Sequence, residues 1–324
     1  MPARWRGSFL QLCWCSLPSS CARAREWCTT NRFKNSMQRS PLANALLWFV
    51  LIIGTAAFVF PLWWMAVVSL ETPERAEAAI TGSGGIALFA PHPQFANYAN
   101  AVRETGSRPW MGFVDALSNS IVVTVLIVLG TVLSSSAVGY AFARLRFRGR
   151  NPLFLLMLAT MMLPGQVTMI PLFLLFRQFG WIDTIMPLVV PAFFGNAFFI
   201  FMYRQFIAQI PESLVEAARI DGLGHIAIWW RIILPLCRPV TAICAVFTFI
   251  GTWNDFLGPL IYLHSDESAT LAVALNGFKN QYGGLEDVHL LMALSVLTMI
   301  PCIVLFIAAQ KTFVEGLARG AVKG

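Results

Sequence analysis

The stretch Glu216-Ala217-Ala218-Arg219-Ile220-Asp221-Gly222, followed by Ile232-Ile233-Leu234-Pro235, lies between two long apolar runs. It is charged, rich in helix-forming residues and punctuated by a glycine, whereas most of the surrounding chain is apolar. A polar segment this regular, in such a chain, indicates a surface that contacts another molecule. Its spacing is Glu-Ala-Ala, three residues, Gly, nine residues, Ile, any residue, Leu-Pro.

The composition is that of a membrane protein. Hydrophobic residues make up 57% of the chain and charged residues 12%, with a mean hydropathy of +0.66, whereas a soluble domain has about 25% charged residues. Runs long enough to cross a hydrocarbon core of about 30 Å recur along the chain. We therefore expect an all-α integral membrane protein with six transmembrane helices, at residues 44–70, 116–143, 152–176, 184–203, 239–262 and 288–309. A barrel would need short segments of alternating polarity, which this sequence lacks.

The distribution of basic residues predicts the orientation in the membrane. If the N-terminus is cytoplasmic, 18 of the 23 Lys and Arg residues fall on the cytoplasmic side, as the positive-inside rule requires. The five others are Arg75, Arg103, Arg108, Arg177 and Lys279. We expect a multi-pass protein of the cell membrane with both termini in the cytoplasm. The net charge of +7 then reflects topology rather than a nucleic-acid surface, because the charges are spread over separate loops.

Residues 1–40 differ from the rest and are predicted to be an N-terminal extension. They resemble a signal peptide only faintly, because Gln11 and Ser16 interrupt a short apolar run. A disordered tail or a start assigned too early fits better, with Met37 as the favoured start. Residues 41–324 are expected to form the transmembrane domain.

The segment from Pro211 to Pro235 has the features of two short helices joined by a sharp turn. Pro211 fits the first position of a helix, and Glu212 and Glu216 lie near the positive end of its dipole. Ala217 and Ala218 are small, so another surface can approach the backbone closely. A connector lying on lipid is the alternative, but such helices are rich in cationic residues.

Gly222 is placed to end the first helix in the left-handed conformation. A second helix is expected from about His225 to Ile233, with the proline of Leu234-Pro235 ending it.

The whole segment resembles the cytoplasmic coupling loop of ABC importer permeases. Other stretches are similar to permeases of the carbohydrate-uptake, maltose-type group, and together they cover most of residues 44–324. They are Pro93–Tyr98, Asn196–Phe206 with Ile210-Pro211, Trp253-Asn254-Asp255-Phe256 with Pro259-Leu260, Val314–Leu317 and Gly320–Gly324. His225 departs from the small or polar residue that is usual near the turn.

The resemblance implies the ABC importer permease fold, with cytoplasmic coupling helices in a coupling segment at 204–238. It implies that an ATPase is contacted by Glu216, Ala217, Ala218, Asp221, Gly222, Leu234 and Pro235. The implied partners are a second permease subunit, a cytoplasmic ABC ATPase dimer and an extracytoplasmic solute-binding protein. The solute would be a sugar, oligosaccharide, polyol or glycerol phosphate.

The chain has no Gly-x-x-x-x-Gly-Lys-Ser/Thr loop. ATP is therefore expected on the partner ATPase, and no enzymatic activity or cofactor is expected in this chain.

Three polar residues at membrane depth are candidates for the transport pathway: Gln166, Asn254 and Asp255. Pro164-Gly165-Gln166 fits helix shaping equally well. Asp255 lies late in its predicted span, which favours a hydrated position or a hydrogen bond to the partner permease over a gate.

An ion-coupled secondary transporter is the alternative function, but it would need further ionisable residues within the spans. A membrane enzyme is less favoured, because His92, His225, His264 and His289 show no metal-ligand spacing. The seven cysteines do not form a disulfide or zinc pattern. No metal site is predicted.

Overall fold

The computed structural model describes residues 41–85, 88–106, 112–282 and 287–321. Within these residues the chain is helical and contains no strand. It divides into two compact units, Met1–Trp63 and Trp64–Gly324, and the boundary falls inside the first described helix. The expectations about residues 1–40 lie outside the described residues.

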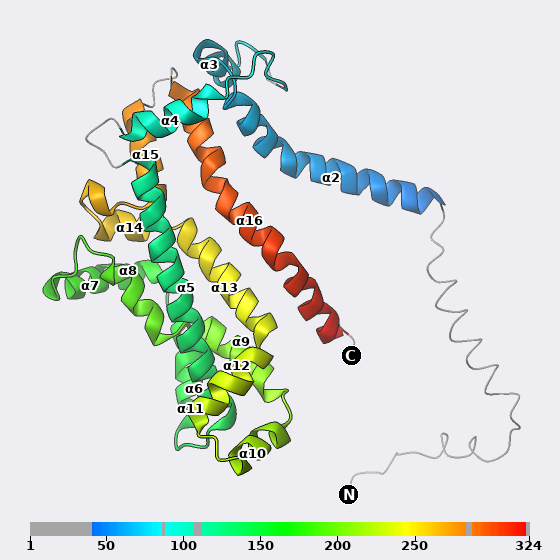
Figure 1. Ribbon diagram of the computed structural model, residues 1–324, viewed down its shortest axis with the longest axis vertical. Coiled ribbons are helices and arrows are strands. Elements are labelled where there is room, and N and C mark those ends of the chain that lie inside the picture. Colours follow the sequence, from blue (N-terminus) through cyan, green and yellow to red (C-terminus); the bar gives the residue numbers. More distant parts are fainter. Residues whose placement is uncertain (1–40, 86–87, 107–111, 283–286, 322–324) are drawn as a thin grey trace, which may run out of the picture. The chain divides into compact units, whose positions relative to one another are not determined.

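The described helices up to residue 208 are α2 Pro41–Val68, α3 Pro73–Thr81, α4 Ala96–Gly106, α5 Phe113–Arg144, α6 Arg150–Thr160, α7 Gly165–Gln178, α8 Met186–Val189, η1 Val190–Phe194 and α9 Ala197–Ala208. Those that follow are α10 Glu212–Ile220, α11 His225–Ile228, η2 Trp229–Ile233, α12 Leu234–Leu236, α13 Arg238–Trp253, α14 Leu257–Tyr262, η3 Asp266–Ser268, α15 Leu271–Tyr282 and α16 Val288–Ala321. In the second unit, α10, α11 and α12 lie at one end and α3, α4 and α15 at the other (Figure 1).

Four of the six predicted spans are helical segments long and apolar enough to cross a membrane by themselves: Asn44–Val68, Phe113–Arg144, Met186–Ala208 and Val288–Gln310. Two bent pairs bring the number to six if each is one span. They are Arg150–Thr160 with Gly165–Gln178, bent by 97°, and His225–Leu236 with Arg238–Trp253, bent by 81°. The expectation of an all-helical, multi-span membrane protein is confirmed.

The predicted spans 152–176 and 239–262 are not continuous helices. In the first, α6 ends at Thr160, and α7 begins after Pro164, whose backbone is extended. A proline disfavours a continuous helix because it has no N–H to donate. In the second, α13 ends at Trp253 and α14 begins at Leu257. The side chain of Asn254 donates to the carbonyl of Ile250, and a carboxylate oxygen of Asp255 accepts from the N–H of Gly258. These two side chains therefore satisfy backbone groups on either side of the break.

Helix α5 is the central element of the second unit, and it packs against α9, α13 and η1. Most of its buried residues are small or hydroxyl-bearing, among them Ser120, Thr124, Gly130, Thr131, Ser135, Ser136 and Gly139, and the larger Phe113 and Val123 are buried with them. Its exposed face carries Ile121, Val122, Val125 and Leu129. Small inward residues and apolar outward residues are the arrangement expected of a helix surrounded by lipid.

Two apolar clusters hold the second unit together. One joins α5, α9, α10, α11 and α13, and it lies beneath the predicted coupling segment. The other joins α4, α5, α13, α15 and α16, and its largest buried side chain is that of Trp253. The indole N–H of Trp253 donates to the carbonyl of Thr298 over 3.1 Å, which links α13 to α16.

Candidate functional site

Helix α10 begins after Pro211 and ends in a left-handed turn at Gly222. Pro211 is extended, with φ −56° and ψ 135°, and so precedes the helix rather than occupying its first position. Gly222 has φ +81°. The N–H of Gly222 donates to the carbonyl of Arg219, and the N–H of Leu223 donates to that of Ala218, each over 3.0 Å. This pair of bonds is a Schellman cap, and the predicted glycine stop is confirmed.

The two faces of α10 differ in composition. Val215 and Ala218 point inward, and only 4% of the Ala218 surface is exposed. Glu216 and Ala217 are exposed, and Ile220 is 87% exposed. Ala218 was predicted to lie on the contact surface beside Ala217. That prediction is corrected, because adjacent helical residues point about 100° apart and Ala218 lies in the buried cluster.

The second arm of the segment is not a single regular helix. α11 is followed by a π-helical turn, Trp229–Ile233, and then by α12, which contains Pro235. The prediction that Pro235 ends this helix is wrong, because the helix continues to Leu236. A wider turn, with the N–H of Leu234 bonded to the carbonyl of Trp229, precedes the proline, whose ring would clash with the carbonyl four residues back in an α-helix. Pro235 is exposed and Leu234 half-buried.

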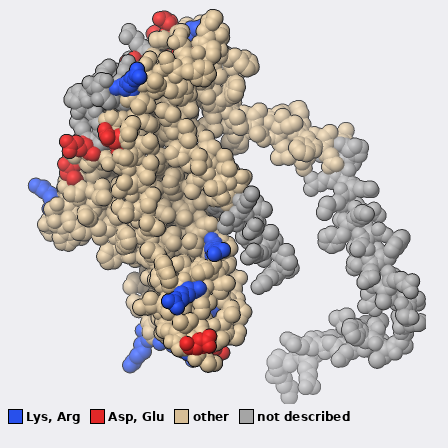
Figure 2. Space-filling view, in the orientation of Figure 1, with Lys and Arg blue, Asp and Glu red and all other residues tan. Residues whose placement is uncertain are grey.

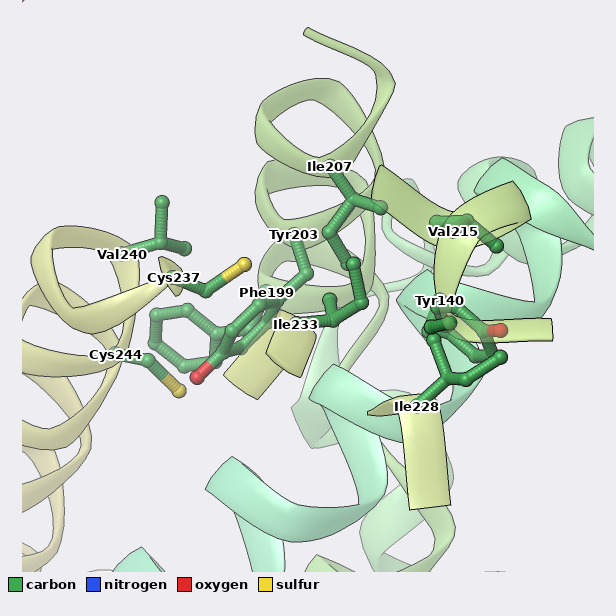
Figure 3. Packing of buried hydrophobic residues seen from close by; sticks show 11 residues of the cluster. Tyr140, Phe199, Tyr203, Ile207, Val215, Ile228, Ile233, Cys237, Val240 and Cys244 are labelled. Carbon is green, nitrogen blue, oxygen red and sulfur yellow. The ribbon is translucent and has the colours of Figure 1, made fainter. Parts of the chain in front are cut away.

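The segment rests on a packed base, shown in Figure 3. Val215 of α10 and Ile228 of α11 lie beside Tyr140 of α5, while Cys237 and Cys244 lie toward α13 (Figure 3). Both arms of the segment thus contribute side chains to the same buried cluster as Tyr140 of α5. The segment is therefore joined to the bundle by buried side chains.

Polar bonds reinforce this base. The hydroxyl of Tyr140 lies 3.3 Å from Nδ1 of His225. The guanidinium of Arg144 donates to the carbonyl of Ile207 over 2.8 Å and also to that of Ile210. The carbonyl of Ile207 lies in the last turn of α9 and that of Ile210 just beyond it, where a cation is favourable. Neither Tyr140 nor Arg144 was singled out from the sequence, although an arginine at the end of a span was a usable signal.

Helices α5 and α9 approach most closely at Gly139. A Cβ at this position would lie 2.6 Å from the Cβ of Tyr203 and 3.2 Å from the carbonyl oxygen of Ile200. The hydroxyl of Tyr203 donates to Oγ1 of Thr241 over 3.0 Å, so the same residue also ties α9 to α13. The site at the coupling segment is thus built on three helices in direct contact.

The three candidate pathway residues do not form one group. Asp255 lines a small cavity together with Ser120, Thr124, Thr252 and Thr270. Asn254 is exposed next to it, at the end of α13, and Gln166 is exposed in the first turn of α7. Neither Asn254 nor Gln166 is among the residues that line the cavity. Its wall combines these four hydroxyl-bearing residues, none of which was predicted from the sequence, with the apolar side chains of Val123, Ile127, Leu188 and Pro259.

A polar cluster at Asp183 was also missed. One carboxylate oxygen of Asp183 accepts bonds from the N–H groups of His264 and Ser265 and from the hydroxyls of Ser265 and Ser268, over 2.8 to 3.0 Å. These bonds, led by that from the N–H of Ser265, lower the pKa of Asp183 to about 2. Asp183 therefore ties the loop after α7 to the loop after α14. A single acid in a short loop gave no signal for such a distant partner.

Within the part of the chain that the structure describes, no group of three or more His, Cys, Asp or Glu side chains is arranged to hold a metal ion.

The comparisons with known proteins converge on one family. Residues 135–319 match the family described as binding-protein-dependent transport system inner membrane component. The arabinooligosaccharides transport system permease protein AraQ of Halalkalibacterium halodurans is 35% identical, and the match covers 87% of this chain and 98% of that protein. The sn-glycerol-3-phosphate transport system permease protein UgpE of Yersinia pestis is 32% identical, with 83% and 93% covered. The melibiose/raffinose/stachyose import permease protein MelC of Bacillus subtilis is 33% identical, with 73% and 84% covered.

A solved structure agrees with these relatives. It is a chain of a bacterial ABC transporter involved in the import of the acidic polysaccharide alginate. The TM-score is 0.72 at 26% sequence identity, over 85% of this chain and 98% of that one. The fold, the family match and the relatives agree that the chain is a multi-pass ABC importer permease, a member of the family of binding-protein-dependent transport system inner membrane components.

Proposed function

We propose that this permease translocates a sugar, an oligosaccharide or a related polyol that an extracytoplasmic binding protein delivers. The relatives are named for arabinooligosaccharides, for melibiose, raffinose and stachyose, and for sn-glycerol-3-phosphate. These solutes are all hydroxylated carbohydrates or a polyol phosphate, which supports this class. A thermal-shift screen of the partner binding protein against such compounds tests it, and stabilisation by an unrelated class alone would contradict it.

We further propose that a second permease subunit and a cytoplasmic ATPase dimer complete the transporter. ATP is hydrolysed on the ATPase subunits, and the coupling segment at 204–238 is where this chain contacts them. Both termini are cytoplasmic in this assembly. The concentration of arginine in the predicted cytoplasmic loops supports that orientation.

The coupling role is supported by the two faces of α10: one face is exposed, and the other is packed in the buried cluster. On α10, Glu216 and Ala217 are exposed, while Val215 and Ala218 belong to the cluster that includes residues of α5, α9 and α13. The small Ala217 side chain permits a close approach by the ATPase, and Glu216 offers a charge to it. Movement of the ATPase subunits then reaches the spans through packed side chains rather than through a flexible loop.

The turn at Gly222 provides one test with a matched control. A Cβ at Gly222 or at Gly224 has open space around it, but Gly222 has φ +81° whereas Gly224 is extended. Gly222→Ala should strain the cap by about 1 kcal/mol, and Gly222→Asp should disturb the docked surface further. Gly224→Ala should leave transport unchanged.

The two alanines provide a second test. Ala217→Trp should leave the protein assembled in the membrane but weaken ATPase binding or uncouple hydrolysis from uptake. Glu216→Lys should do the same by reversing a charge. Ala218→Trp should instead reduce the amount of folded protein, because the ring has to enter a packed core.

Uptake, ATPase stimulation and co-purification of the ATPase are measured for each variant. Normal coupling in Gly222→Asp, Ala217→Trp and Glu216→Lys would falsify the coupling role. It would also reopen the ion-coupled secondary transporter as the alternative.

Single cysteines at positions 83 and 224, on a background without native thiols, test the orientation. An impermeant reagent added outside should label position 83 and leave position 224 unmodified. The reverse pattern would overturn the proposed orientation.

Gln166, Asn254 and Asp255 remain proposed pathway residues. Asp255 has support from its place in the wall of a small cavity that is lined in part by hydroxyl groups. Asp255→Asn should reduce uptake while the assembled complex and its ATPase activity persist. Unchanged uptake in this variant and in Gln166→Ala and Asn254→Ala would remove these residues from the pathway.

A further inference from the structure

The loop between α5 and α6 carries three arginines within five residues: Arg146, Arg148 and Arg150. Arg146 and Arg148 are exposed and Arg150 is half-buried. In the described part of the chain, the one ion pair lies elsewhere, between Arg75 and Glu71. The positive charge of this loop is therefore not balanced by a neighbouring carboxylate of the same chain.

The backbone between Leu145 and Arg150 forms a tight turn. The N–H of Arg150 donates to the carbonyl of Phe147 over 3.4 Å, and Gly149 has the left-handed φ of +84° that the tight turn requires. The guanidinium of Arg150 also donates to the carbonyl of Leu145 over 3.4 Å. Residues 146–152 line an open, shallow hollow of about 570 Å³. All three arginines are among these lining residues.

The hollow lies next to an apolar surface. Leu153, Leu155 and Leu156, in the first turns of α6, are all exposed, as is Phe147 in the loop itself. α6 belongs to one of the candidate spans. Side chains that face acyl chains directly beside a basic loop place that loop at the level of lipid headgroups.

We propose that this hollow binds the phosphate of an anionic phospholipid headgroup, while Phe147 and the leucines of α6 contact its acyl chains. Guanidinium groups bind phosphate in a bidentate manner, which an ammonium group cannot do. A topological role requires only positive charge, so lysine would serve it equally well. The site does not depend on the transported solute or on the side of the membrane that the loop occupies.

Lipid retention by the full chain, co-purified with the subunits that assemble with it, tests the proposal. The complex is placed in nanodiscs of mixed phosphatidylglycerol and phosphatidylcholine and analysed by native mass spectrometry. The test variant is Arg146→Gln with Arg148→Gln. The matched control is Arg103→Gln with Arg177→Gln, which removes two exposed arginines outside this loop and outside the coupling segment. A third variant, Arg146→Lys with Arg148→Lys, keeps the charge.

We expect the wild type and the matched control to retain phosphatidylglycerol equally. Each basic residue at an anionic surface accounts for about a fivefold change in affinity, so the test variant should bind roughly twentyfold more weakly. The lysine variant should fall between them. Equal retention by all variants, or full retention by the lysine variant, would overturn the proposal.

A second experiment distinguishes the binding of a lipid from the binding of a free anion. Inorganic phosphate is added to nanodiscs of phosphatidylcholine alone, and the thermal stability of the complex is compared with that in phosphatidylglycerol. Stabilisation by phosphatidylglycerol and not by phosphate is expected, and it should be lost in the test variant. Stabilisation by phosphate alone would show that the hollow takes a soluble anion instead. If the double variant fails to assemble, Arg148→Gln by itself carries the same comparison.

Discussion

The two bent helix pairs of this permease have similar bend angles, but the side chains around the two bends are packed differently. Between α6 and α7 the chain bends by 97°, and between α12 and α13 by 81°. At the first bend Met162 is 83% exposed and Gly165 has no neighbouring side chain. At the second, Cys237 is 0% exposed and packs with Ile233 and Val240.

The buried contacts of α6 and α7 lie at a distance from the bend between them. Phe154 is the buried side chain of α6, where it contacts Phe142, Phe201 and the guanidinium of Arg204. Phe176 is the buried side chain of α7, where it contacts Trp181 and Tyr262. The first bend therefore depends on local backbone chemistry and two distant anchors, and the second on continuous packing. A proline in the sequence does not by itself distinguish these two situations.

The largest expected effect is at one of the two anchors. Phe154→Ala should destabilise the protein by roughly 3 kcal/mol, because it leaves a cavity that the neighbouring rings cannot fill. Leu155→Ala, on the exposed side of the same helix, should cost less than about 1 kcal/mol. Unfolding by sodium dodecyl sulfate in mixed micelles measures both. Equal losses would mean that α6 is not held chiefly through Phe154.

The next effect contrasts a packed glycine with a free one. Gly139→Val brings its Cβ to 2.6 Å from that of Tyr203, and overpacking of this kind costs about 1–3 kcal/mol. Gly165→Val, in the first turn of α7, meets nothing within 4 Å and should change stability by less than about 0.5 kcal/mol. The same unfolding assay applies. A larger loss in Gly165→Val would show that the first bend is packed after all.

A smaller effect is expected at the hydrogen bond between Tyr203 and Thr241. Tyr203→Phe, Thr241→Val and the double variant form a cycle whose coupling energy should be about 1 kcal/mol. The bond joins α9 to α13 next to the second bend, so the cycle measures how much polar contact adds to packing there. A coupling energy near zero would assign the support of this bend to packing alone.

The smallest effect is local and concerns Asp183, beyond the end of α7. Because its pKa is lowered to about 2, its bonds contribute fully above the ordinary pKa near 4 and are lost as the pH falls toward 2. Hydrogen exchange at the amides of His264 and Ser265, referred to an unstructured peptide at each pH, should therefore accelerate between pH 4 and pH 2. Asp183→Ala should show fast exchange at every pH.

Asp183→Asn is the matched control, since an amide oxygen still accepts bonds and Asn tolerates the positive φ at this position. It should remove the pH dependence while retaining part of the protection. Unchanged protection in Asp183→Ala would show that the loop after α14 is fixed by other contacts.

Much of the architecture follows from the sequence. The apolar runs predict the spans because a membrane helix must satisfy its backbone internally over a fixed thickness. Gly222 is predictable as a left-handed cap because few other residues adopt that conformation at low cost. These are local properties, so neighbouring residues are enough to reveal them.

Other features depend on partners distant in the sequence. Ala217 and Ala218 are indistinguishable by residue type, and only the position of Tyr140 and its neighbours decides which one is buried. Pro235 continues a helix because a wider turn precedes it. Asp183 is bonded to residues of a loop that is 81 or more residues away in the sequence. The break at Asn254 and Asp255 likewise depends on how α14 is placed, so a hydropathy pattern shows one continuous run there.

The close approach of α5 and α9 at Gly139 has a mechanical consequence. Two helices in such close contact at Gly139, with Arg144 bonded to the end of α9, are expected to move together over their shared length. α5 has 32 residues, which corresponds to about 48 Å. A tilt of about 5° imposed at the end beside α10 therefore displaces the opposite end by about 4 Å. That distance is comparable to the width of a sugar ring, so a small rotation at one surface of the membrane is geometrically sufficient to open or close a passage at the other.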